Sequence, residues 1–448
     1  MRNYVVALLA CAAFAVGCSG GSSDPVLSGD EPGGSNPPPA NPPPTLPPPS
    51  PPPPPSGPSF DPEFNEPQNL IEVNYDNAKS TEENGDILES AIENLDPGDR
   101  LVIGSGTYTM DSRLSVSIDG TEANPVSIEA ADGAAVRIHR PLENQNLIDI
   151  DRASYLTIKG IEWTGGSLGI RFIDCHHIYF YNNNVHDTGD AAVTANSSDT
   201  HHLYFIDNHV HHTNGYGEGF YLGANNAVYI THHTLVVGNH IHDTGPRQGD
   251  GVEIKHGSYA CLISDNLIEN TNYPGVLVYG TDGQAERNII ERNVIIGSAQ
   301  AGIQVAADAV VRNNLIIDCV DTCIRSQPHQ GATPSNLTIV HNTLINTGQC
   351  LSPVTWTGTG IVFANNVMYS DISDEIQDPT QNATVSGNVI LDDLTAFAGV
   401  TLDGAARDAK PLVGSDIIGA GDSDYAVADD LHGAARTGVL DSGAVDAD

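Results

Sequence analysis

A short hydrophobic phrase that contains an asparagine returns along much of the chain. Apolar residues, an Asn and a further apolar pair follow one another as Tyr-Phe-Tyr-Asn-Asn-Asn-Val around Asn183 and as Leu-Ile-Ser-Asp-Asn-Leu-Ile around Asn266. Short apolar runs that recur every roughly 20–50 residues, without helical periodicity, are typical of a solenoid of strands. The full series is Asn183, Asn208, Asn239, Asn266, Asn293, Asn314, Asn342, Asn365 and Asn388.

Each repeat is expected to form one coil, whose apolar side chains are buried only by stacking on the next coil. The recurring Asn predicts an internal ladder, in which each side-chain amide bonds its equivalents about 4.8 Å above and below. The predicted fold class is therefore all-β: a single-stranded, right-handed parallel β-helix from roughly Leu101 to Leu391. A short helix around Ile87–Ile92 is expected to cap its N-terminal end.

The first 58 residues carry a targeting pattern and a linker. Arg2 precedes an apolar run, Tyr4 to Val16, that is too short to span a bilayer and ends at Gly17-Cys18. This pattern resembles the lipobox of bacterial lipoproteins, which implies a signal peptide over residues 1–17 and a lipidated Cys18. Leu8-Leu9-Ala10-Cys11 is a rival box, and ordinary secretion is the alternative.

Since no Asp follows Cys18, the resemblance also implies an outer membrane lipoprotein that faces the periplasm or the cell surface. Residues 18–58 are rich in Pro, Gly and Ser, a composition that favours a semi-rigid polyproline II stalk. Residues 59–448 remain for the β-helix domain. Its coil pattern weakens from about residue 392, where a loop-rich segment is expected.

The composition restricts the partners. The formal net charge is −39 and there are four lysines, which argues against nucleic acid and against acidic membrane surfaces. The same acidity opposes a purely electrostatic hold on an acidic polysaccharide, a conflict that a divalent cation would resolve. A salty habitat explains the acidity equally well. We expect a monomer.

Five cysteines lie beyond the N-terminal pattern, so at least one thiol is free or paired with another molecule. Cys323 and Cys350 fall at similar positions on successive coils, and an oxidising setting would allow them to bond. The pairing among the five stays open: Cys175, Cys261, Cys319, Cys323 and Cys350.

A second strand in each coil begins after a small residue, as in Gly251-Val252-Glu253. Alternation along this strand predicts that Val252 and Ile254 point inward, whereas Glu253 and Lys255 point outward. The position of Lys255 is taken by Gly223 on the preceding coil and by Tyr279 on the following one.

The residue before each small residue forms another column, which contains Glu218 and then Asp250. Two carboxylates one strand apart, with Glu253 nearby, are the oxygen ligands that a hard cation prefers. The sequence therefore predicts a Ca²⁺ site formed by Glu218, Asp250 and Glu253.

The segment Asp250-Gly251-Val252-Glu253-Ile254-Lys255 resembles the catalytic coil of β-helical polysaccharide lyases. The nearest resemblance is to the alginate lyase and chondroitinase B family, polysaccharide lyase family six, and family-nine pectate lyases share a similar spacing. This resemblance implies that Lys255 removes the C5 proton of a uronic acid while carboxylates hold Ca²⁺ against the sugar carboxylate. Asp250 matches a ligand position five residues before the Lys.

The chain departs from both patterns. Gln248 stands where family six has a further acid, Tyr279 stands where it has an Arg, and the Asp cluster of family nine is missing. A Lys acts as a base only when burial or a neighbouring cation favours its neutral form, and the leaving oxygen needs an acid. We expect Tyr279 to be that acid. The alternative for Lys255 is a surface ion pair with Glu253 or Asp250. Further substrate contacts are expected from Tyr221, His211, His242, His256 and Arg325.

Thirteen of the 17 histidines lie between His176 and His256 and repeat by column, as in His186, His211 and His242. Three imidazoles in register suit Zn²⁺ or another transition metal. Columns of a solenoid also repeat for stacking alone, and the two explanations stay open. His211 and His242 border the coils of Glu218 and Asp250, which suggests substrate binding or a role as base.

We therefore predict a lipid-anchored lyase that cleaves an acidic, uronate-containing polysaccharide by β-elimination. The alternative is a non-catalytic carbohydrate-binding or surface structural β-helix, because fold alone does not determine function. A glycoside hydrolase is a third option, but no suitable carboxylate pair on neighbouring strands supports it.

Overall fold

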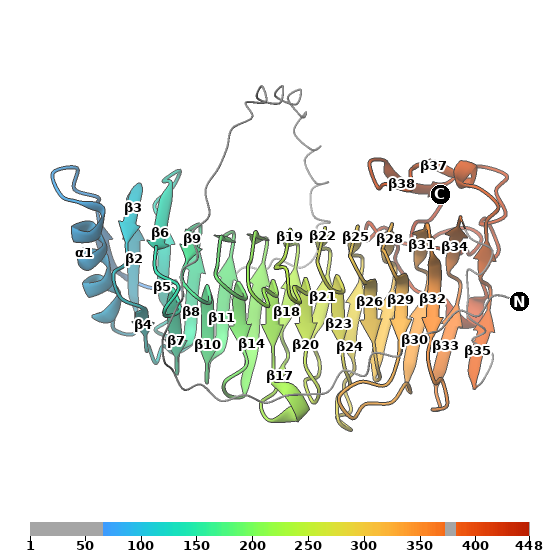
Figure 1. Cartoon of the computed structure of the whole chain (residues 1–448), viewed down its shortest axis with the longest axis horizontal. Coiled ribbons are helices and arrows are strands. Elements are labelled where there is room, and N and C mark those ends of the chain that lie inside the picture. Colours follow the sequence, from blue (N-terminus) through green and yellow to red (C-terminus); the bar gives the residue numbers. More distant parts are fainter. Residues whose placement is uncertain (1–65, 372–381, 448) are drawn as a thin grey trace, which may run out of the picture. The chain divides into compact units, whose positions relative to one another are not determined.

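The computed structural model describes residues 66–371 and 382–447, and its regular structure consists mainly of short strands arranged in three parallel sheets. Figure 1 shows the strands of successive coils stacked in chain order from α1 to β35. We name the sheets A, B and C in the order in which the chain visits them within a coil.

Sheet A comprises β1 Asn69–Val73, β2 Asp99–Ile103, β5 Val126–Ala130, β8 Ser154–Lys159, β11 His176–Tyr181, β14 Thr200–Ile206, β17 Thr231–His232, β18 Leu235–Val237, β21 Leu262–Ser264, β24 Asn288–Glu291, β27 Ala309–Arg312, β30 Leu337–Val340, β33 Ile361–Ala364 and β35 Ala383–Ser386. Sheet B comprises β3 Gly106–Thr109, β6 Val136–Arg140, β9 Glu162–Gly165, β12 Asn184–His186, β15 His209–His211, β19 His240–His242, β22 Leu267–Glu269, β25 Val294–Ile296, β28 Leu315–Ile317, β31 Thr343–Asn346, β34 Val367–Ser370 and β36 Val389–Ile390. Sheet C comprises β4 Leu114–Val116, β7 Ile148–Asp151, β10 Ile170–Ile173, β13 Val193–Ala195, β16 Phe220–Leu222, β20 Val252–Ile254, β23 Val276–Val278, β26 Ala301–Val305, β29 Thr322–Ser326 and β32 Gln349–Pro353.

Strand alternation explains why these short segments are stable only as a stack. On one coil Ile263, Ile268 and Val276 come from the three different sheets, and all three are fully buried in one hydrophobic core. Each strand pairs in parallel with its equivalent on the next coil, so every coil buries the apolar face of its neighbour. The predicted parallel β-helix is confirmed. Its pairing begins at β1, before the predicted start at Leu101, and continues to β36.

The asparagine ladder occupies the corner between sheets A and B. The Oδ1 atom of Asn266 accepts bonds from the backbone N (2.9 Å) and the Nδ2 (3.0 Å) of Asn239. The same pattern repeats on each coil, and most of these amides are buried, so their polar atoms are satisfied inside the core. The ladder runs through Asn183, Asn208, Asn239, Asn266, Asn293, Asn314, Asn342, Asn366 and Asn388.

One predicted ladder residue was wrong by a single position. Asn366, and not Asn365, bonds Asn342 and Asn388. Asn365 has φ 56°, the left-handed conformation that the residue before the ladder Asn also adopts in neighbouring coils. Asn tolerates this conformation better than most residues. Asn365 therefore takes the left-handed position of the corner, and Asn366 takes the ladder position.

Helix α1 (Thr81–Glu93) covers the first coils, as the sequence predicts for a cap, although it begins earlier than expected. Ser80 and Glu83 form a capping box at its start, and Leu88 and Ile92 are buried in the core. Gly85 lies against the backbone of β3, where an added Cβ would meet the Thr109 carbonyl oxygen at 2.0 Å. The cap therefore requires glycine at this position.

The C-terminal segment, loop-rich as predicted, packs on the outer face of sheet B (Figure 1). It contains the antiparallel pair β37 (Phe397–Val400) and β38 (Arg407–Pro411), and the short turns η2 (Leu394–Ala396) and η3 (Ser423–Tyr425). Phe397 and Ile417 bury the outward apolar side chains Leu315 and Ile345 of the late coils. Arg407 pairs with Glu269 of β22 at 2.7 Å, at the near edge of this cover.

The five cysteines beyond the N-terminal pattern are all buried free thiols in the structure. Cys11, Cys18 and the Pro-rich linker lie outside the described residues. Within residues 66–371 and 382–447, no helix combines the length and the apolar composition needed to cross a membrane.

Candidate active site

Strand β20 places the residues of greatest chemical interest. Val252 and Ile254 are fully buried in the core, so the alternation of the strand turns Glu253 to the outer face of sheet C, as predicted. The register sets Glu253 between Tyr221 of β16 and Leu277 of β23. Lys255 follows directly, at the end of the strand.

Lys255 lies in a hydrogen-bonded cluster with Glu253 and Tyr279. Its amine pairs with Glu253 Oε1 and lies 3.5 Å from the Tyr279 hydroxyl, which itself donates to Glu253 Oε1 at 2.8 Å. The rings of Tyr221 and Tyr279 have their centroids 4.4 Å and 5.1 Å from the amine. The sequence therefore correctly predicted Tyr279 as a neighbour of Lys255.

The alternative of a surface ion pair is wrong in one respect. Lys255 does pair with Glu253, but Lys255 is only 5% exposed and Glu253 only 3%. The neighbouring coils and their tyrosine rings enclose the pair. Because burial removes the hydration of both charges, the attraction within a buried ion pair adds little net stability. The pair is therefore not explained by a purely stabilising role.

Three carboxylates converge beside this pair. Glu218, Asp250 and Glu253 are all buried, and one oxygen from each lies within 4.8 Å of the others. Asp250 Oδ1 and Glu253 Oε2 have no hydrogen-bond partner. Buried carboxylates that converge and keep unpartnered oxygens are the arrangement that a hard divalent cation satisfies, so the predicted ligand set fits Ca²⁺.

The electrostatics reflect this crowding of like charges. Burial, followed by the charge of Glu253, raises the pKa of Glu218 to about 7. Burial, followed by Glu253 and Glu218, also raises the pKa of Asp250 well above its ordinary value. Without a cation, Glu218 and Asp250 therefore hold protons more firmly than free carboxylic acids do.

Both tyrosines keep their phenolic protons. Burial and the nearby Glu253 raise the pKa of Tyr221 and of Tyr279 far above the ordinary value. The two differ in access, because Tyr221 is half-buried whereas Tyr279 is 2% exposed. Either phenol is thus a proton donor that stays protonated at neutral pH.

A cavity of about 140 Å³ opens next to the cluster, on the side of the following coils. Asp250, Glu253 and Tyr279 form one wall. The sequence did not predict most of the remaining lining, which is rich in amide side chains: Gln248, Tyr273, Pro274, Leu277, Gln300, Gln304, Gln327 and His329. Gln304 follows from the strand register, since it is the outward neighbour of Leu277.

His329 was not predictable, because it belongs to the connection after β29. This connection folds back so that the His329 ring stacks on Tyr279, with centroids 4.7 Å apart. Gln330 then bonds Asn225 at 2.8 Å, which joins the connection to η1 (Asn225–Ala227) after β16. Contacts between connections so distant in sequence leave no periodic signal.

The other predicted contact residues are placed as follows. Tyr221 lies against Lys255. His256 turns toward the connection after β23, where its Nε2 atom lies 3.4 Å from Asp282. Arg325 lies on β29, in register with Gln304, and pairs with Asp321. Arg325 is thus in register with Glu253 on the outer face of sheet C, three strands farther along.

The structure does not bring His211 and His242 to this cluster. They lie on β15 and β19, on the outer face of sheet B, where they stack on each other. His211 and His242 border Glu218 and Asp250 in the sequence, but they belong to a different sheet and lie away from them in space.

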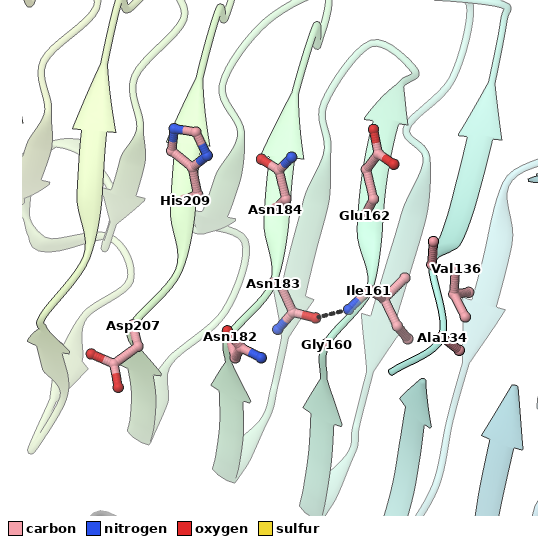
Figure 2. Close-up of a pocket in the computed structure, with 11 residues that line it drawn as sticks. Ala134, Val136, Gly160, Ile161, Glu162, Asn182, Asn183, Asn184, Asp207 and His209 are labelled. Atoms are coloured by element: carbon pink, nitrogen blue, oxygen red, sulfur yellow. Dashed lines mark hydrogen bonds between the residues drawn. The ribbon is translucent and has the colours of Figure 1, made fainter. Parts of the chain in front are cut away.

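A second cavity, of about 230 Å³, lies at the corner between sheets A and B. Figure 2 shows Glu162, Asn184 and His209 on neighbouring strands of sheet B, with Asp207 and Asn182 at the corner below them. Burial raises the pKa of Asp207. No Lys lines this cavity among the described residues, so Lys255 marks the other one as the candidate active site.

Comparisons with known proteins agree with this architecture. The family model described as "Right handed beta helix region" matches residues 226–390. The chain is a right-handed parallel β-helix. No curated protein matches it.

Several solved structures share the fold of this β-helix. The alginate lyase from Paenibacillus sp. str. FPU-7 is 17% identical with a TM-score of 0.50, over 65% of this chain and 99% of that chain. The pectate lyase Pel9A is 13% identical with a TM-score of 0.51, over 86% and 98% of the two chains. XylC in complex with xylose is 9% identical with a TM-score of 0.50, over 80% and 94%. At these identities the comparisons show the fold.

Proposed function

We propose that this β-helix is a polysaccharide lyase that cleaves an acidic, uronate-containing polysaccharide by β-elimination. The observation that carries the proposal is the buried Lys255 amine, which lies between two tyrosine rings and beside three carboxylates. A base, an acid and a cation-binding group are the parts that the reaction requires. The likeness in fold to an alginate lyase and a pectate lyase supports the same class.

The reaction needs one proton removed and one delivered. In the proposed step the neutral Lys255 amine takes the C5 proton of the uronate. The C–H electron pair becomes a C4–C5 double bond, and the C4–O bond breaks. The Tyr279 hydroxyl gives its proton to the departing oxygen, so charge and atoms balance. The contact of 3.5 Å between the amine and the phenol oxygen then returns the proton from Lys255 to Tyr279.

Glu218, Asp250 and Glu253 would hold a Ca²⁺-type cation. When bound, such a cation neutralises the uronate carboxylate and favours the neutral form of the nearby amine. Glu253 has a second function, because its Oε1 atom accepts from both Lys255 and Tyr279 and so positions base and acid together.

The outer row of sheet C supports an extended acidic substrate. In register it runs from Arg171 through Thr194, Tyr221, Glu253, Leu277 and Gln304 to Arg325. The two arginines therefore lie on opposite sides of Glu253, each three strands away, or about 14 Å at the usual strand spacing. In a chain this acidic, two cations on this row are suited to carboxylates several sugars to either side of the sugar that is cleaved.

The N-terminal pattern leads to a proposal about location. Lipidation of Cys18 and the Pro-rich linker would hold the β-helix at the outer membrane, facing the periplasm or the cell surface. Cys18→Ser should release the full chain from the membrane fraction into the soluble fraction. Release of the wild-type chain would instead indicate ordinary secretion.

The rival function is carbohydrate binding without catalysis. One experiment separates the two: alginate, pectate and glycosaminoglycans are incubated with the protein, with and without a chelator, and the ultraviolet absorbance of the unsaturated product is followed. A lyase produces rising absorbance on at least one acidic polymer. Saturable binding without any absorbance change on that polymer would support the rival and overturn our proposal.

A further inference from the structure

Five imidazoles form a compact group on the outer face of sheet B. We call this group the imidazole cluster. Between its outward side chains, Val185, Val210 and Ile241 point inward and are fully buried. The cluster lies on a different sheet from Lys255, so nothing in it depends on the proposed lyase activity. Its members are His186 on β12, His209 and His211 on β15, and His240 and His242 on β19.

The cluster is arranged as two stacked columns. His186, His211 and His242 stack with ring centroids 4.7 Å and 4.9 Å apart. His209 stacks on His240 at 5.0 Å. The two columns meet where His209 Nε2 lies 2.7 Å from His242 Nε2. One ring nitrogen from each of His209, His211 and His242 lies within 4.8 Å of the others.

A second set of histidines, on sheet A, provides an internal comparison. There His176, His201 and His232 stack with neighbours about 5 Å apart, and Tyr259 continues the column at 4.8 Å. Tyr155 likewise stacks on His177 at the other end of the adjacent column. Since phenol rings replace imidazoles at these ends, stacking accounts for the positions of His176 and His232. One ring nitrogen from each of His177, His201 and His202 also lies within 4.8 Å of the others.

Carboxylates, rather than rings, bound the imidazole cluster. Glu162 lies 2.9 Å from His186 Nε2, and Glu269 lies 3.0 Å from His240 Nε2. Within the cluster, Asp243 Oδ2 lies 2.8 Å from His242 Nδ1. A carboxylate that accepts from one ring nitrogen fixes the tautomer and leaves the other nitrogen with its lone pair, as in many metal-binding histidines.

The bond to Asp243 therefore directs the lone pair of His242 Nε2 toward His209 Nε2. Two imidazole nitrogens 2.7 Å apart share a proton in a hydrogen bond, and a metal ion bound by both would take the place of that proton. In a tetrahedral Zn²⁺ site with bonds of about 2.0 Å, two ligand nitrogens lie about 3.3 Å apart. His209 and His242 thus need to separate by well under 1 Å, a shift that half-buried side chains allow. The His211 ring must also turn inward, which exchanges its contact with Asn184 or His212 for the ion.

We propose that His209, His211 and His242 form a binding site for a divalent transition-metal ion such as Zn²⁺. Three histidines and one open position form a known ligand set for this ion, and imidazole nitrogen suits it better than it suits Ca²⁺. Of the three ligands, His209 also lines the cavity of about 230 Å³ (Figure 2), which gives the site a side open to solvent. The bound ion links β15 to β19 and thereby joins two coils.

The protonation states favour binding at neutral pH. Burial, together with the neighbouring imidazoles, lowers the pKa of His209 to about 4 and that of His211 to about 3, and also lowers the pKa of His242. The groups that face these rings are His186, His240, His212, Asn184 and Asp243. All three proposed ligands are therefore neutral near pH 7, and binding should weaken as the pH falls toward about 4.

Calorimetric titration of the full chain with ZnCl₂ tests the site. Excess Ca²⁺ is present throughout, so that the carboxylate cluster does not compete for Zn²⁺. We expect one Zn²⁺ per chain. His242→Phe keeps a ring in the stack but removes the ligand, and it should weaken binding by at least about tenfold. The matched control His232→Phe lies in the sheet A stack but outside the His177, His201 and His202 group, and it should bind Zn²⁺ as the wild type does.

A second variant and a second measurement protect against a misfolded protein. If circular dichroism shows that His242→Phe is unfolded, His209→Phe replaces it, with the same expectation. Electron paramagnetic resonance of the Cu²⁺ complex should show coupling to imidazole nitrogens. The proposal is overturned if the wild type shows no saturable Zn²⁺ binding, if His232→Phe weakens binding as much as the cluster variant does, or if Cu²⁺ shows only oxygen ligands.

Discussion

Tyr279 and Lys255 occupy the same position on consecutive coils, and this register places the phenol oxygen 3.5 Å from the amine. Both groups also contact the same oxygen of Glu253. A solenoid places side chains beside each other in this way whenever equivalent positions of adjacent coils both point outward. The proposed base and acid are therefore neighbours because of register, although 24 residues separate them.

Lys255→Met tests the base. The variant keeps the length of the side chain and removes the amine, so uronate elimination should fall about 10²–10⁴-fold. It also leaves Glu253 buried without its cation, a change that typically costs about 3–5 kcal/mol of stability. Rates are therefore compared well below the melting temperature of the variant. Lys79→Met, at an exposed position before α1, should match the wild type. Near wild-type elimination by Lys255→Met would remove Lys255 from the mechanism.

The two phenols that flank the amine are compared in a separate pair of variants. Tyr279→Phe removes the hydroxyl that bonds Glu253 and lies near Lys255, and we expect it to lower kcat about 10²-fold or more. Tyr221→Phe keeps the ring over the amine and should mainly raise KM. Since Tyr221 is the more accessible of the two, the reverse result would make it the acid and refute our assignment.

Glu218→Gln tests the cation site through stability. The folded pKa of Glu218, about 7, exceeds the ordinary value of 4.5, so the folded chain binds the proton more tightly than the unfolded chain does. This contribution is complete below about pH 4.5 and is lost as the pH rises through about 7, on the order of 3 kcal/mol in all. Gln imitates the protonated acid. In chelator at about pH 8, the variant should therefore melt higher than the wild type, and the difference should vanish near pH 5.

Added Ca²⁺ should reverse that order. The wild type should gain stability because the cation binds the folded chain, whereas Glu218→Gln has lost one of few carboxylate ligands and should gain much less. Differential scanning calorimetry at a series of Ca²⁺ concentrations measures both effects. Equal Ca²⁺ stabilisation of the two proteins would exclude Glu218 as a ligand.

The ladder gives a prediction about folding. Asn266→Ala removes bonds to Val236 O and Asn293 Oδ1, both at 2.8 Å, and leaves the backbone N of Asn239 unpaired in the core. Each orphaned buried group costs about 1–3 kcal/mol, so the loss should reach several kcal/mol. Asn388→Ala, at the half-buried last position, should cost distinctly less in urea unfolding. Equal losses would show that the ladder does not act as a buried network.

The sequence predicted those features that repeat. The coil register followed from the Asn series, and the outward side of β20 followed from strand alternation, so the neighbourhood of Glu218, Asp250, Glu253, Lys255 and Tyr279 was predictable. The same reasoning failed at Asn365, where two asparagines adjoin and only the backbone conformation distinguishes them.

Two kinds of position were beyond prediction. Burial of the Lys255 and Glu253 pair depends on side chains from neighbouring coils and on the connection that carries His329. The spatial separation of His211 from Glu218 depends on which sheet each strand joins, and the repeat spacing alone does not contain that information. Predictions from columns are reliable within a sheet and unreliable between sheets.

The ladder corner also restricts where the chain can gain or lose residues during evolution. In the ladder coils, two residues connect each strand of sheet A to the following strand of sheet B, as Asp265 and Asn266 do. The connections after sheet C differ widely, from residues 174–175 after β10 to residues 327–336 after β29. In the ladder coils, the variation in length is thus found in the connections before and after sheet C, which carries the candidate active site. New loops, and with them new substrates, can arise there while the scaffold that keeps the chain folded stays the same.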